Sequence, residues 1–250
     1  MRESKYDDKI FFDKYSKMAR SVYGLQGAGE WEVFKGMMPK FDNKRVLDLG
    51  CGFGWHCKYA IENKAREVIG IDLSEKMLEQ AKKINSDENI KYIKTSIEEV
   101  NFQREYFDIV ISSLAFHYVK DFDQVCKNVH AMLKENGDFI FSVEHPVFTA
   151  YGSQQWYTDE KGNKIHWPVD NYFYEGIRDS EFLGERVTKY HKTLTTYINE
   201  LLKCGFVIKE IIEPTPTKEM LNEIEDMKEE LRRPMMLLIS AKKGKLLSKD

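Results

Sequence analysis

The chain has 250 residues, and its 38 lysine and arginine residues against 41 aspartate and glutamate residues give a net charge of −3. A hydrophobic fraction of 42% beside a charged fraction of 32% is a globular balance and excludes a disordered or membrane-embedded chain. The near-neutral charge argues against a general nucleic-acid binder, because such proteins carry a basic field.

The first residues contain no apolar core of the kind that a signal peptide requires, and no apolar run is long enough to span a bilayer. The cysteines Cys51, Cys57, Cys126 and Cys204 are scattered and form no close CxxC pair. Scattered thiols without a signal peptide indicate reduced cysteines. We therefore expect a cytoplasmic protein with no metal site.

From residue 45 to 145, short β-branched runs alternate with helical patterns. Ser74 is a favourable N-cap for one helix, and Asn136 with Gly137 is expected to end another. Strands separated by helices of 10–15 residues predict βαβ units and a parallel sheet. Strands are expected at residues 45–49, 67–71, 90–93, 107–111 and 139–143, and helices at 55–63, 74–84 and 122–133.

The last hundred residues have a different pattern. Residues 145–186 show no regular period, and a helix is expected at 190–203. Two strands follow, at 206–212 and 235–241, with a charged helix between them at 217–231. The lysine-rich end is expected to be a solvated tail, and it contains Lys242, Lys243, Lys245 and Lys249.

The strongest signal is the run Val46-Leu-Asp-Leu-Gly-Cys-Gly-Phe-Gly54, in which a strand is followed by a glycine turn and the start of a helix. Gly50 and Gly52 allow the backbone to turn sharply and to approach a ligand closely. Asp72 ends the second strand at the distance from which an acidic residue reaches ribose hydroxyls. Asp48 is expected to face the same loop, where its carboxylate suits an amine or a positive centre.

These motifs resemble those of the class I S-adenosylmethionine-dependent methyltransferases, in the small-molecule branch related to quinone biosynthesis (methyltransferase type 11). The matching stretch runs from residue 45 to about 143. The resemblance implies an α/β fold with a Rossmann-like, doubly wound, seven-stranded sheet whose last two strands are antiparallel. It also implies S-adenosylmethionine as cofactor, S-adenosylhomocysteine as product, and no metal.

The resemblance implies roles for individual residues. The glycines would border the methionine moiety, Asp72 would hold the ribose, and Leu73 and Met77 would flank the adenine. Many relatives have Gly-Asp-Ala where this chain has Thr95-Ser-Ile97, so the adenine contact would be an uncharged one from Ser96. The expected cofactor-binding set is Tyr15, Arg20, Asp48, Gly50, Cys51, Gly52, Asp72, Leu73, Met77, Ser96, Ile97 and Ser113.

An amphipathic segment at residues 11–20 precedes a glycine-rich stretch at 24–29. In the resembling enzymes such a segment folds over the cofactor as a lid. Tyr15 and Arg20 are the expected contacts, with Arg20 on the methionine carboxylate. The alternative is a helix that only covers the core.

The loop after the fourth strand, Ser112-Ser-Leu-Ala-Phe-His-Tyr118, excludes several classes of methyl transfer. It lacks the Asn-Pro-Pro-Tyr type of box found in enzymes that methylate exocyclic amines, and it lacks a Pro-Cys nucleophile. It carries no carboxylate for a catechol-type magnesium site, and the chain has no CxxxCxxC cluster. Methyl transfer to an oxygen, nitrogen, sulfur or activated carbon of a small molecule remains, chiefly through positioning and desolvation.

Two histidines are candidate catalytic groups. His117 follows the fourth strand and could take a proton, or it could simply pack against the methionine moiety. His145 follows the fifth strand and could orient or deprotonate the acceptor, or it could cap a helix before Pro146.

Ten aromatic residues fall between residues 145 and 190, about twice their density in the rest of the chain. We expect a cap that shapes the acceptor pocket, with a small satellite core as the alternative. The chain would then be a single domain, with a lid at 1–30, a cofactor core at 45–144, a cap insertion at 145–189, and helices and a strand hairpin at 190–243. We expect a monomer or homodimer.

Two rival functions stay open. An RNA-modifying enzyme of the same fold predicts a basic face, which the net charge and the absence of a basic aromatic cluster oppose. A non-catalytic S-adenosylmethionine-binding protein would use the charged segment at 217–233 as a partner surface.

Overall fold

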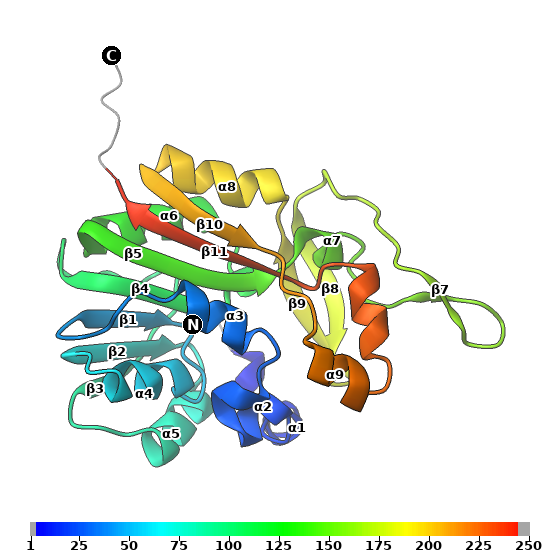
Figure 1. The fold of residues 1–250 in the computed structure, drawn as a ribbon, viewed down its shortest axis with the longest axis horizontal. Helices are drawn as coiled ribbons and strands as arrows, with labels where there is room; N and C mark the ends of the chain where they lie inside the picture. Colours follow the sequence, from blue (N-terminus) through cyan, green and yellow to red (C-terminus); the bar gives the residue numbers. More distant parts are fainter. Residues whose placement is uncertain (1–3, 245–250) are drawn as a thin grey trace.

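A computed structural model describes residues 4–244, and a seven-stranded sheet forms its centre (Figure 1). The strand order is β10-β11-β5-β4-β1-β2-β3. The strands are β1 (Arg45–Leu49), β2 (Glu67–Asp72), β3 (Ile90–Lys94), β4 (Phe107–Ser113), β5 (Leu133–Glu144), β10 (Phe206–Ile212) and β11 (Met236–Lys243).

The sheet is parallel from β3 to β5, and β11 runs antiparallel to both β5 and β10. The chain order reverses between β1 and β4, which is the point where open α/β sheets bind ligands at the carboxyl ends of their strands. The predicted Rossmann-like fold with an antiparallel last strand pair is therefore confirmed.

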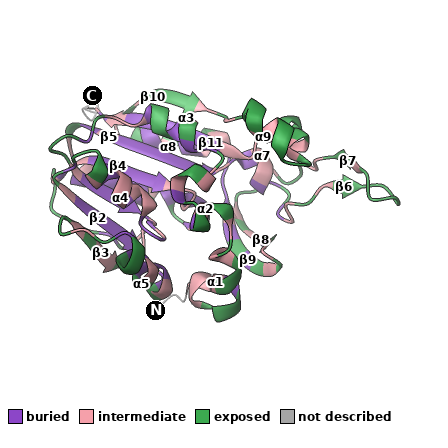
Figure 2. Ribbon diagram, turned by 60° about the horizontal axis from the view of Figure 1, so that its bottom comes forward, coloured by how far each residue is buried: buried purple, intermediate pink, exposed green. Residues whose placement is uncertain are grey.

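The sheet buries both faces, because successive side chains of a strand point to opposite sides. In β5, Phe139 and Phe141 join one buried cluster with helices α6 and α8, whereas Ile140 joins the other cluster with α3, α4 and α5. Figure 2 shows the central strands as the buried part of the molecule. These helices are α3 (Trp31–Met37), α4 (Trp55–Glu62), α5 (Glu75–Ile84), α6 (Phe122–Met132) and α8 (Leu194–Lys203).

The N-terminal segment folds into short helices beside the carboxyl edge of the sheet. Side chains cap two of them, since Ser4 accepts from the amide of Tyr6 and Asp8 accepts from the amide of Phe11. The elements are η1 (Lys5–Asp7), α1 (Lys9–Tyr15), α2 (Ala19–Val22) and η2 (Gly24–Gly27).

The segment predicted to be irregular contains two antiparallel hairpins. One, β6 (Tyr157–Thr158) with β7 (Lys164–His166), projects from the body of the molecule (Figures 1 and 2). The other, β8 (Gly176–Phe182) with β9 (Glu185–His191), lies beside the sheet edge after the short helix α7 (Pro146–Thr149). The expected boundary at residue 189 falls inside β9, because the hairpin register fixes Gly176 opposite His191.

Other predicted boundaries were wrong. The helix at 122–133 ends at Met132, and Leu133 already pairs with Phe107, so the Asn136 turn is an irregularity inside β5. Residues 190 and 191 belong to β9, so α8 begins at Leu194 and not at the predicted residue 190. The expected helix at 217–231 divides into α9 (Lys218–Glu223) and η4 (Met227–Arg232), because the backbone of Asp226 between them is left-handed.

The expectation of a solvated tail is wrong for Lys242 and Lys243. Lys242 and Lys243 belong to β11, and Lys243 is buried with its Nζ 2.7 Å from the carbonyl oxygen of Leu133. Lys245 and Lys249 lie outside the described residues.

Candidate active site

A large cavity of about 1410 Å³ lies at the carboxyl edge of the sheet. Gly50, Asp72, Ser113 and Glu144, which stand at or just after the ends of β1, β2, β4 and β5, form its floor. The N-terminal segment and the β8–β9 hairpin supply the remaining walls. Segments from the whole length of the chain therefore meet at one site.

The glycine loop needs its glycines for two different reasons. A side chain at Gly50 would bring a Cβ to 2.6 Å from the Cβ of Ala115, so the loop packs too closely for any other residue. At Gly52, a Cβ would meet no atom within 4 Å, and this residue lines the cavity. Both have positive φ angles, 77° and 53°, which L side chains rarely adopt. Gly52 thus leaves open space for a ligand.

Asp72 joins the ends of β1 and β2. Its Oδ2 accepts the amide of Gly52 at 3.0 Å, and its Oδ1 accepts the amide of Ser74 at 2.8 Å. Asp7 lies close by, accepting the hydroxyl of Ser74 at 2.6 Å. Burial raises the pKa of Asp72 to about 6, and the neighbouring Asp7 adds to this. The sequence had not singled out Asp7, although it lines the same cavity.

Four further residues of the predicted cofactor set line the same part of the cavity, beyond Asp72. They come from the turn after β2, from the first turn of α5 and from the loop after β3, where Ser96 accepts the amide of Glu99 at 3.2 Å. These cavity-lining residues are Leu73, Met77, Ser96 and Ile97.

Asp48 and Cys51 do not line this cavity. Asp48 is 1% exposed, and its Oδ2 accepts the thiol of Cys57 at 3.3 Å behind the loop. Burial raises the pKa of this carboxyl group to about 7. Cys51 faces a small side cavity instead. The expectation that Asp48 faces the ligand fails because its side chain points into the helix-covered side of the sheet.

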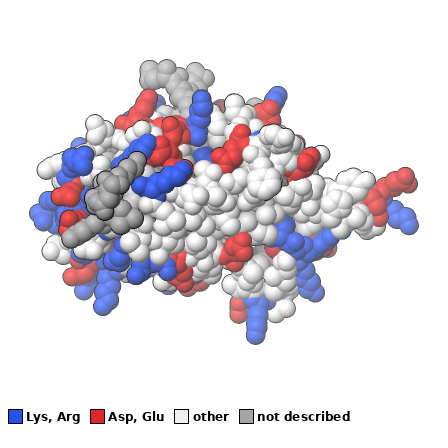
Figure 3. Space-filling model, turned by 90° about the horizontal axis from the view of Figure 1, so that it is seen from above, with Lys and Arg blue, Asp and Glu red and all other residues white. Residues whose placement is uncertain are grey.

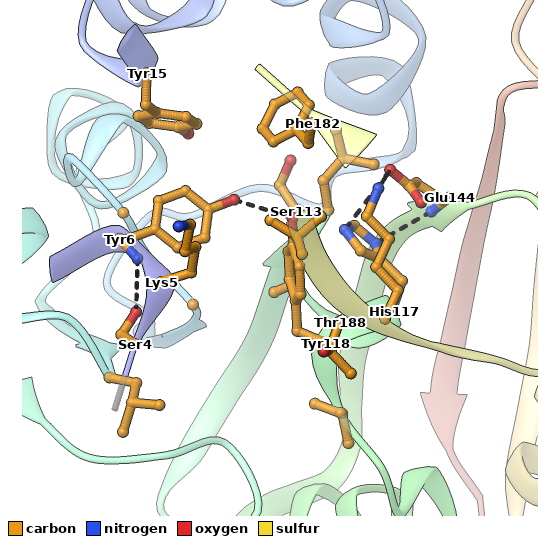
Figure 4. Close-up of a pocket in the computed structure, with 18 of the residues that line it drawn as sticks. Ser4, Lys5, Tyr6, Tyr15, Ser113, His117, Tyr118, Glu144, Phe182 and Thr188 are labelled. Carbon is orange, nitrogen blue, oxygen red and sulfur yellow. Dashed lines mark hydrogen bonds and ion pairs between the residues drawn. The ribbon is translucent and has the colours of Figure 1, made fainter. Parts of the chain in front are cut away.

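Tyr15 and Arg20 reach the cavity from the N-terminal segment. The ring of Tyr15 packs edge-on against Phe53, with centroids 5.8 Å apart, and Arg20 pairs with the buried Glu30 at 2.5 Å. The hydroxyls of Tyr6 and Tyr118 lie 3.2 Å apart, joining this segment to the loop after β4 (Figure 4).

His117 lies on the short helix η3 (Phe116–Tyr118), and it lines the cavity although it is only 3% exposed. Its Nδ1 accepts the backbone amide of Glu144 at 3.5 Å, and its Nε2 lies 3.9 Å from Glu144 Oε1 (Figure 4). Burial lowers the pKa of His117 to about 4, against the opposing charge of Glu144. The imidazole is therefore neutral at pH 7.

Three polar side chains that the sequence interpretation did not assign form a network beside His117. Lys189 Nζ lies 2.6 Å from Glu144 Oε1 and 2.7 Å from Gln154 Oε1, and Gln154 Nε2 donates to Glu144 Oε2 at 2.7 Å. Burial alone would raise the pKa of Glu144, but His117, Lys189 and Gln154 together hold it below its ordinary value. The sequence did carry a signal for Lys189. It lies midway between Val187 and His191, and all three side chains face the buried side of β9.

His145 lies away from the cavity. Its Nδ1 accepts the amide of Val147 at 3.0 Å and so caps α7, while its Nε2 lies 2.7 Å from Glu213 Oε1. The structure gives it the capping role that the sequence left as an alternative to catalysis.

The N-terminal segment also contacts the β8–β9 hairpin across the cavity. Glu185 pairs with Lys5 and with Lys14, both at 3.2 Å, and the rings of Phe11 and Phe182 meet with centroids 5.9 Å apart. These contacts join the two segments that line this part of the cavity.

The chain is similar to known proteins in sequence and in fold. The profile of a family described as Methyltransferase domain matches residues 47–141. An uncharacterised protein of Haemophilus influenzae is 33% identical over 249 residues, which cover 96% of this chain and 97% of that protein. A crystal structure from Listeria monocytogenes, assigned as an S-adenosylmethionine-dependent methyltransferase, is 56% identical with a TM-score of 0.84, covering 89% of this chain and 100% of the other. An S-adenosylmethionine-dependent methyltransferase structure from Mesorhizobium loti is 41% identical with a TM-score of 0.81, covering 88% and 100%.

This chain belongs to the class I S-adenosylmethionine-dependent methyltransferases. The family resemblance predicted from the glycine motif is thereby confirmed. The sequence similarity to a methyltransferase of a named pathway covers less of the chain. The ubiquinone biosynthesis O-methyltransferase of Bradyrhizobium diazoefficiens is 38% identical over 101 residues, 39% of each chain. The cofactor of the methyltransferase family is S-adenosylmethionine.

In the methyltransferase, no group of three His, Cys, Asp or Glu side chains within residues 4–244 could hold a metal ion. None of the helices in this described part combines the length and the apolar character that a membrane crossing requires.

Proposed function

We propose that this methyltransferase transfers the methyl group of S-adenosylmethionine to a small-molecule acceptor bound under the β8–β9 hairpin. The observation that carries the proposal is the continuity of the cavity, which runs from Gly50 and Asp72 to His117, Glu144 and Lys189. Its volume of about 1410 Å³ exceeds the roughly 300–1,000 Å³ typical of a single drug-sized ligand. The cavity has room for the cofactor and for a second molecule.

The residues at one end fit the cofactor. The open space beside Gly52 would admit the methionine chain, and the carboxylate of Asp72 would accept hydrogen bonds from the ribose hydroxyls. Leu73, Met77 and Ile97 would pack on the adenine, and Ser96 would offer it an uncharged hydrogen bond. Bound here, S-adenosylmethionine supplies a methyl group that its sulfonium already activates.

The residues at the other end would position the acceptor. With Nδ1 of His117 accepting a backbone amide, its proton lies on Nε2, so we propose that His117 donates a hydrogen bond. The Glu144 carboxylate, neutralised by Lys189, is then the group available to accept the O–H or N–H of an acceptor. Tyr15 and Phe182 would exclude water, and desolvation strengthens each of these contacts.

A small acceptor is favoured over RNA by the charge distribution. The net charge is −3, and acidic and basic side chains are interspersed over the face in Figure 3, with no broad basic patch on it. An RNA-modifying enzyme needs such a patch to hold the phosphate backbone.

Titration calorimetry with S-adenosylmethionine and S-adenosylhomocysteine tests the proposed cofactor-binding residues. Asp72→Ala should weaken both affinities about tenfold or more, because two charge-assisted hydrogen bonds to the ribose are lost. The exposed Asp42→Ala is the matched control. Equal affinity of Asp72→Ala and the native protein would show that the ribose does not lie on Asp72.

A methyl-transfer assay with labelled S-adenosylmethionine tests which class of acceptor is methylated. A metabolite extract and bulk tRNA serve as parallel substrates. We expect label in the small-molecule fraction. Label in tRNA alone would establish the RNA-modifying alternative. Tight cofactor binding without transfer to either pool would favour a non-catalytic binding protein.

A further inference from the structure

The acceptor end of the cavity presents a hydrogen-bond donor and an acceptor at a set separation. His117 Nε2 lies 3.9 Å from Glu144 Oε1 (Figure 4), which is too long for a direct hydrogen bond. A single oxygen atom placed about 2.8 Å from each of the two would span this gap with an angle of about 90°. Both residues line the cavity, so a bound molecule can supply that oxygen.

Neighbouring groups hold both side chains in place. Nδ1 of His117 accepts the amide of Glu144 at 3.5 Å, which puts the imidazole proton on Nε2. The two carboxylate oxygens of Glu144 accept from Lys189 and from Gln154. His117 and Lys189 are only 3% and 1% exposed. The cavity wall therefore offers one N–H donor and one carboxylate acceptor with little freedom to move.

Of the possible nucleophiles, a hydroxyl group matches this pair best. Its oxygen has one hydrogen and two lone pairs, so it can donate to Glu144, accept from His117 and keep a lone pair for the methyl group. A neutral amine has a single lone pair, which a hydrogen bond from His117 would occupy. A thiol is only a weak donor and a weak acceptor.

The charges around the cavity disfavour an anionic acceptor. Within residues 4–244, seven acidic and four basic residues line it. Each of the four basic residues already has a carboxylate partner, and they are Lys5, Arg20, Arg186 and Lys189. A phosphate or carboxylate group would therefore meet an excess of negative charge. A cation gains little beside Glu144, because Lys189 neutralises that carboxylate.

Apolar side chains surround the polar pair. The ring centroid of Phe182 lies 5.6 Å from Lys189 Nζ, and Met236 stands opposite Glu144 in the sheet register. Phe148 lies on α7, just after the end of β5. All three apolar residues line the cavity, so they suit an acceptor whose hydroxyl group is attached to an apolar ring.

The acidity of the hydroxyl group also matters. His117, Lys189 and Gln154 hold the pKa of Glu144 below its ordinary value against the effect of burial, so this carboxylate is a weak base. A weak base takes a proton efficiently only from an acidic group. A phenol has a pKa of about 10, as tyrosine does, whereas an aliphatic alcohol holds its proton far more tightly.

We propose that the methyl acceptor is an uncharged phenol whose hydroxyl group lies between His117 Nε2 and Glu144 Oε1. The inference rests on the proposed function and names the substrate class of the same site. The phenol oxygen forms a bond to the methyl carbon as the methyl–sulfur bond breaks, and the sulfur keeps the electron pair of that bond. The hydroxyl proton passes to Glu144 Oε1.

The product can be classified without knowing the acceptor in advance. A metabolite extract is incubated with the native protein and S-adenosylmethionine that carries carbon-13 in its methyl group. In two-dimensional NMR spectra, the chemical shift of the labelled carbon separates O-methyl from N-, S- and C-methyl products, and its long-range coupling identifies the carbon that bears the methoxy group. We expect a methoxy group on an aromatic carbon, in a compound that neither a cation nor an anion exchanger retains at neutral pH.

Glu144→Gln should slow formation of this product by at least about a hundredfold, because glutamine can accept a hydrogen bond but not the proton. Its affinity for S-adenosylhomocysteine, measured by calorimetry, should stay within about twofold of the native value. The double variant Glu144→Gln/Lys189→Met leaves no buried lysine unpaired and should be equally slow. Glu160→Gln, in the projecting β6–β7 hairpin, is the matched control.

Several outcomes would overturn the inference while the proposed function stands. They are a labelled N-, S- or C-methyl product, a methoxy group on a saturated carbon, and a product that an ion exchanger retains. A native rate in both Glu144 variants would also overturn it. If the native protein labels no small molecule at all, the proposed function fails and the inference fails with it.

Discussion

The carboxyl group of Asp48 is enclosed between the glycine loop and α4. Its Oδ2 accepts the thiol of Cys57, whereas its Oδ1 has no hydrogen-bond partner within residues 4–244. Burial raises its pKa from an ordinary value near 3.8 to about 7, and the charge of Asp72 adds to the rise. Between about pH 4 and pH 7, the native state therefore still holds a proton that the unfolded chain has already lost. Over this window the free energy of unfolding falls as pH rises.

Asp48→Asn should remove this part of the pH dependence, because the amide cannot ionise and can still accept from Cys57. Between pH 5 and pH 8, the stability of the variant relative to the native protein should rise by about 2–3 kcal/mol. Urea unfolding at both pH values measures the difference, with the exposed Asp42→Asn as control. A difference that does not change with pH would mean that Asp48 ionises normally in the folded protein.

At the scale of elements, the N-terminal segment and the β8–β9 hairpin meet beside the cavity through contacts of unequal strength. Phe11 is fully buried and packs against Phe182, whereas the ion pairs of Glu185 with Lys5 and Lys14 lie at the surface. Exposed ion pairs contribute little to stability and are screened by salt. The apolar contact should therefore set the docked position, and the ion pairs should tune how often the segment opens.

Glu185→Gln should increase hydrogen exchange of the amides in residues 5–15, by at most about fivefold because surface ion pairs are weak. The native protein in 1 M salt should approach the variant, since the Debye length there is about 3 Å. Exchange measured by mass spectrometry tests this, with Glu160→Gln as the control. Identical exchange in the variant and the native protein would rule out a role for Glu185 in holding the segment.

At the scale of the whole molecule, one sheet connects both buried clusters and the cap. β5 supplies Phe141 to one cluster and Ile140 to the other, and its last residue, Glu144, binds Lys189 of the cap hairpin. We therefore propose that the described residues form one cooperative domain.

Phe141→Ala should destabilise the protein by about 3–5 kcal/mol, because a fully buried ring packed on Phe116, Phe122 and Phe139 is lost. Far-ultraviolet circular dichroism and tryptophan fluorescence should report the same shifted transition. Phe173→Ala, at an 86% exposed position, should change stability by less than about 0.5 kcal/mol. Two separate transitions in Phe141→Ala would contradict a single domain.

Local patterns were enough to predict the sheet and the position of the ligand cavity. The period of each strand and helix, the glycine turn and the N-cap at Ser74 depend on residues close in sequence, so β1, β2, α5 and β10 were predicted within a residue or two. The positions of Gly50, Gly52 and Asp72 followed from the same local geometry, because each stands at the end of a parallel strand.

Only the tertiary structure decided which polar groups face the cavity. Asp48 and Asp72 both lie near the ends of neighbouring strands, but one points behind the loop and the other lines the cavity. Glu144 and Lys189 are 45 residues apart in the chain, and Lys5 and Glu185 are 180 residues apart. Such pairings depend on how β9 and the N-terminal segment dock on the sheet, and docking is set by burial across the whole molecule rather than by local sequence.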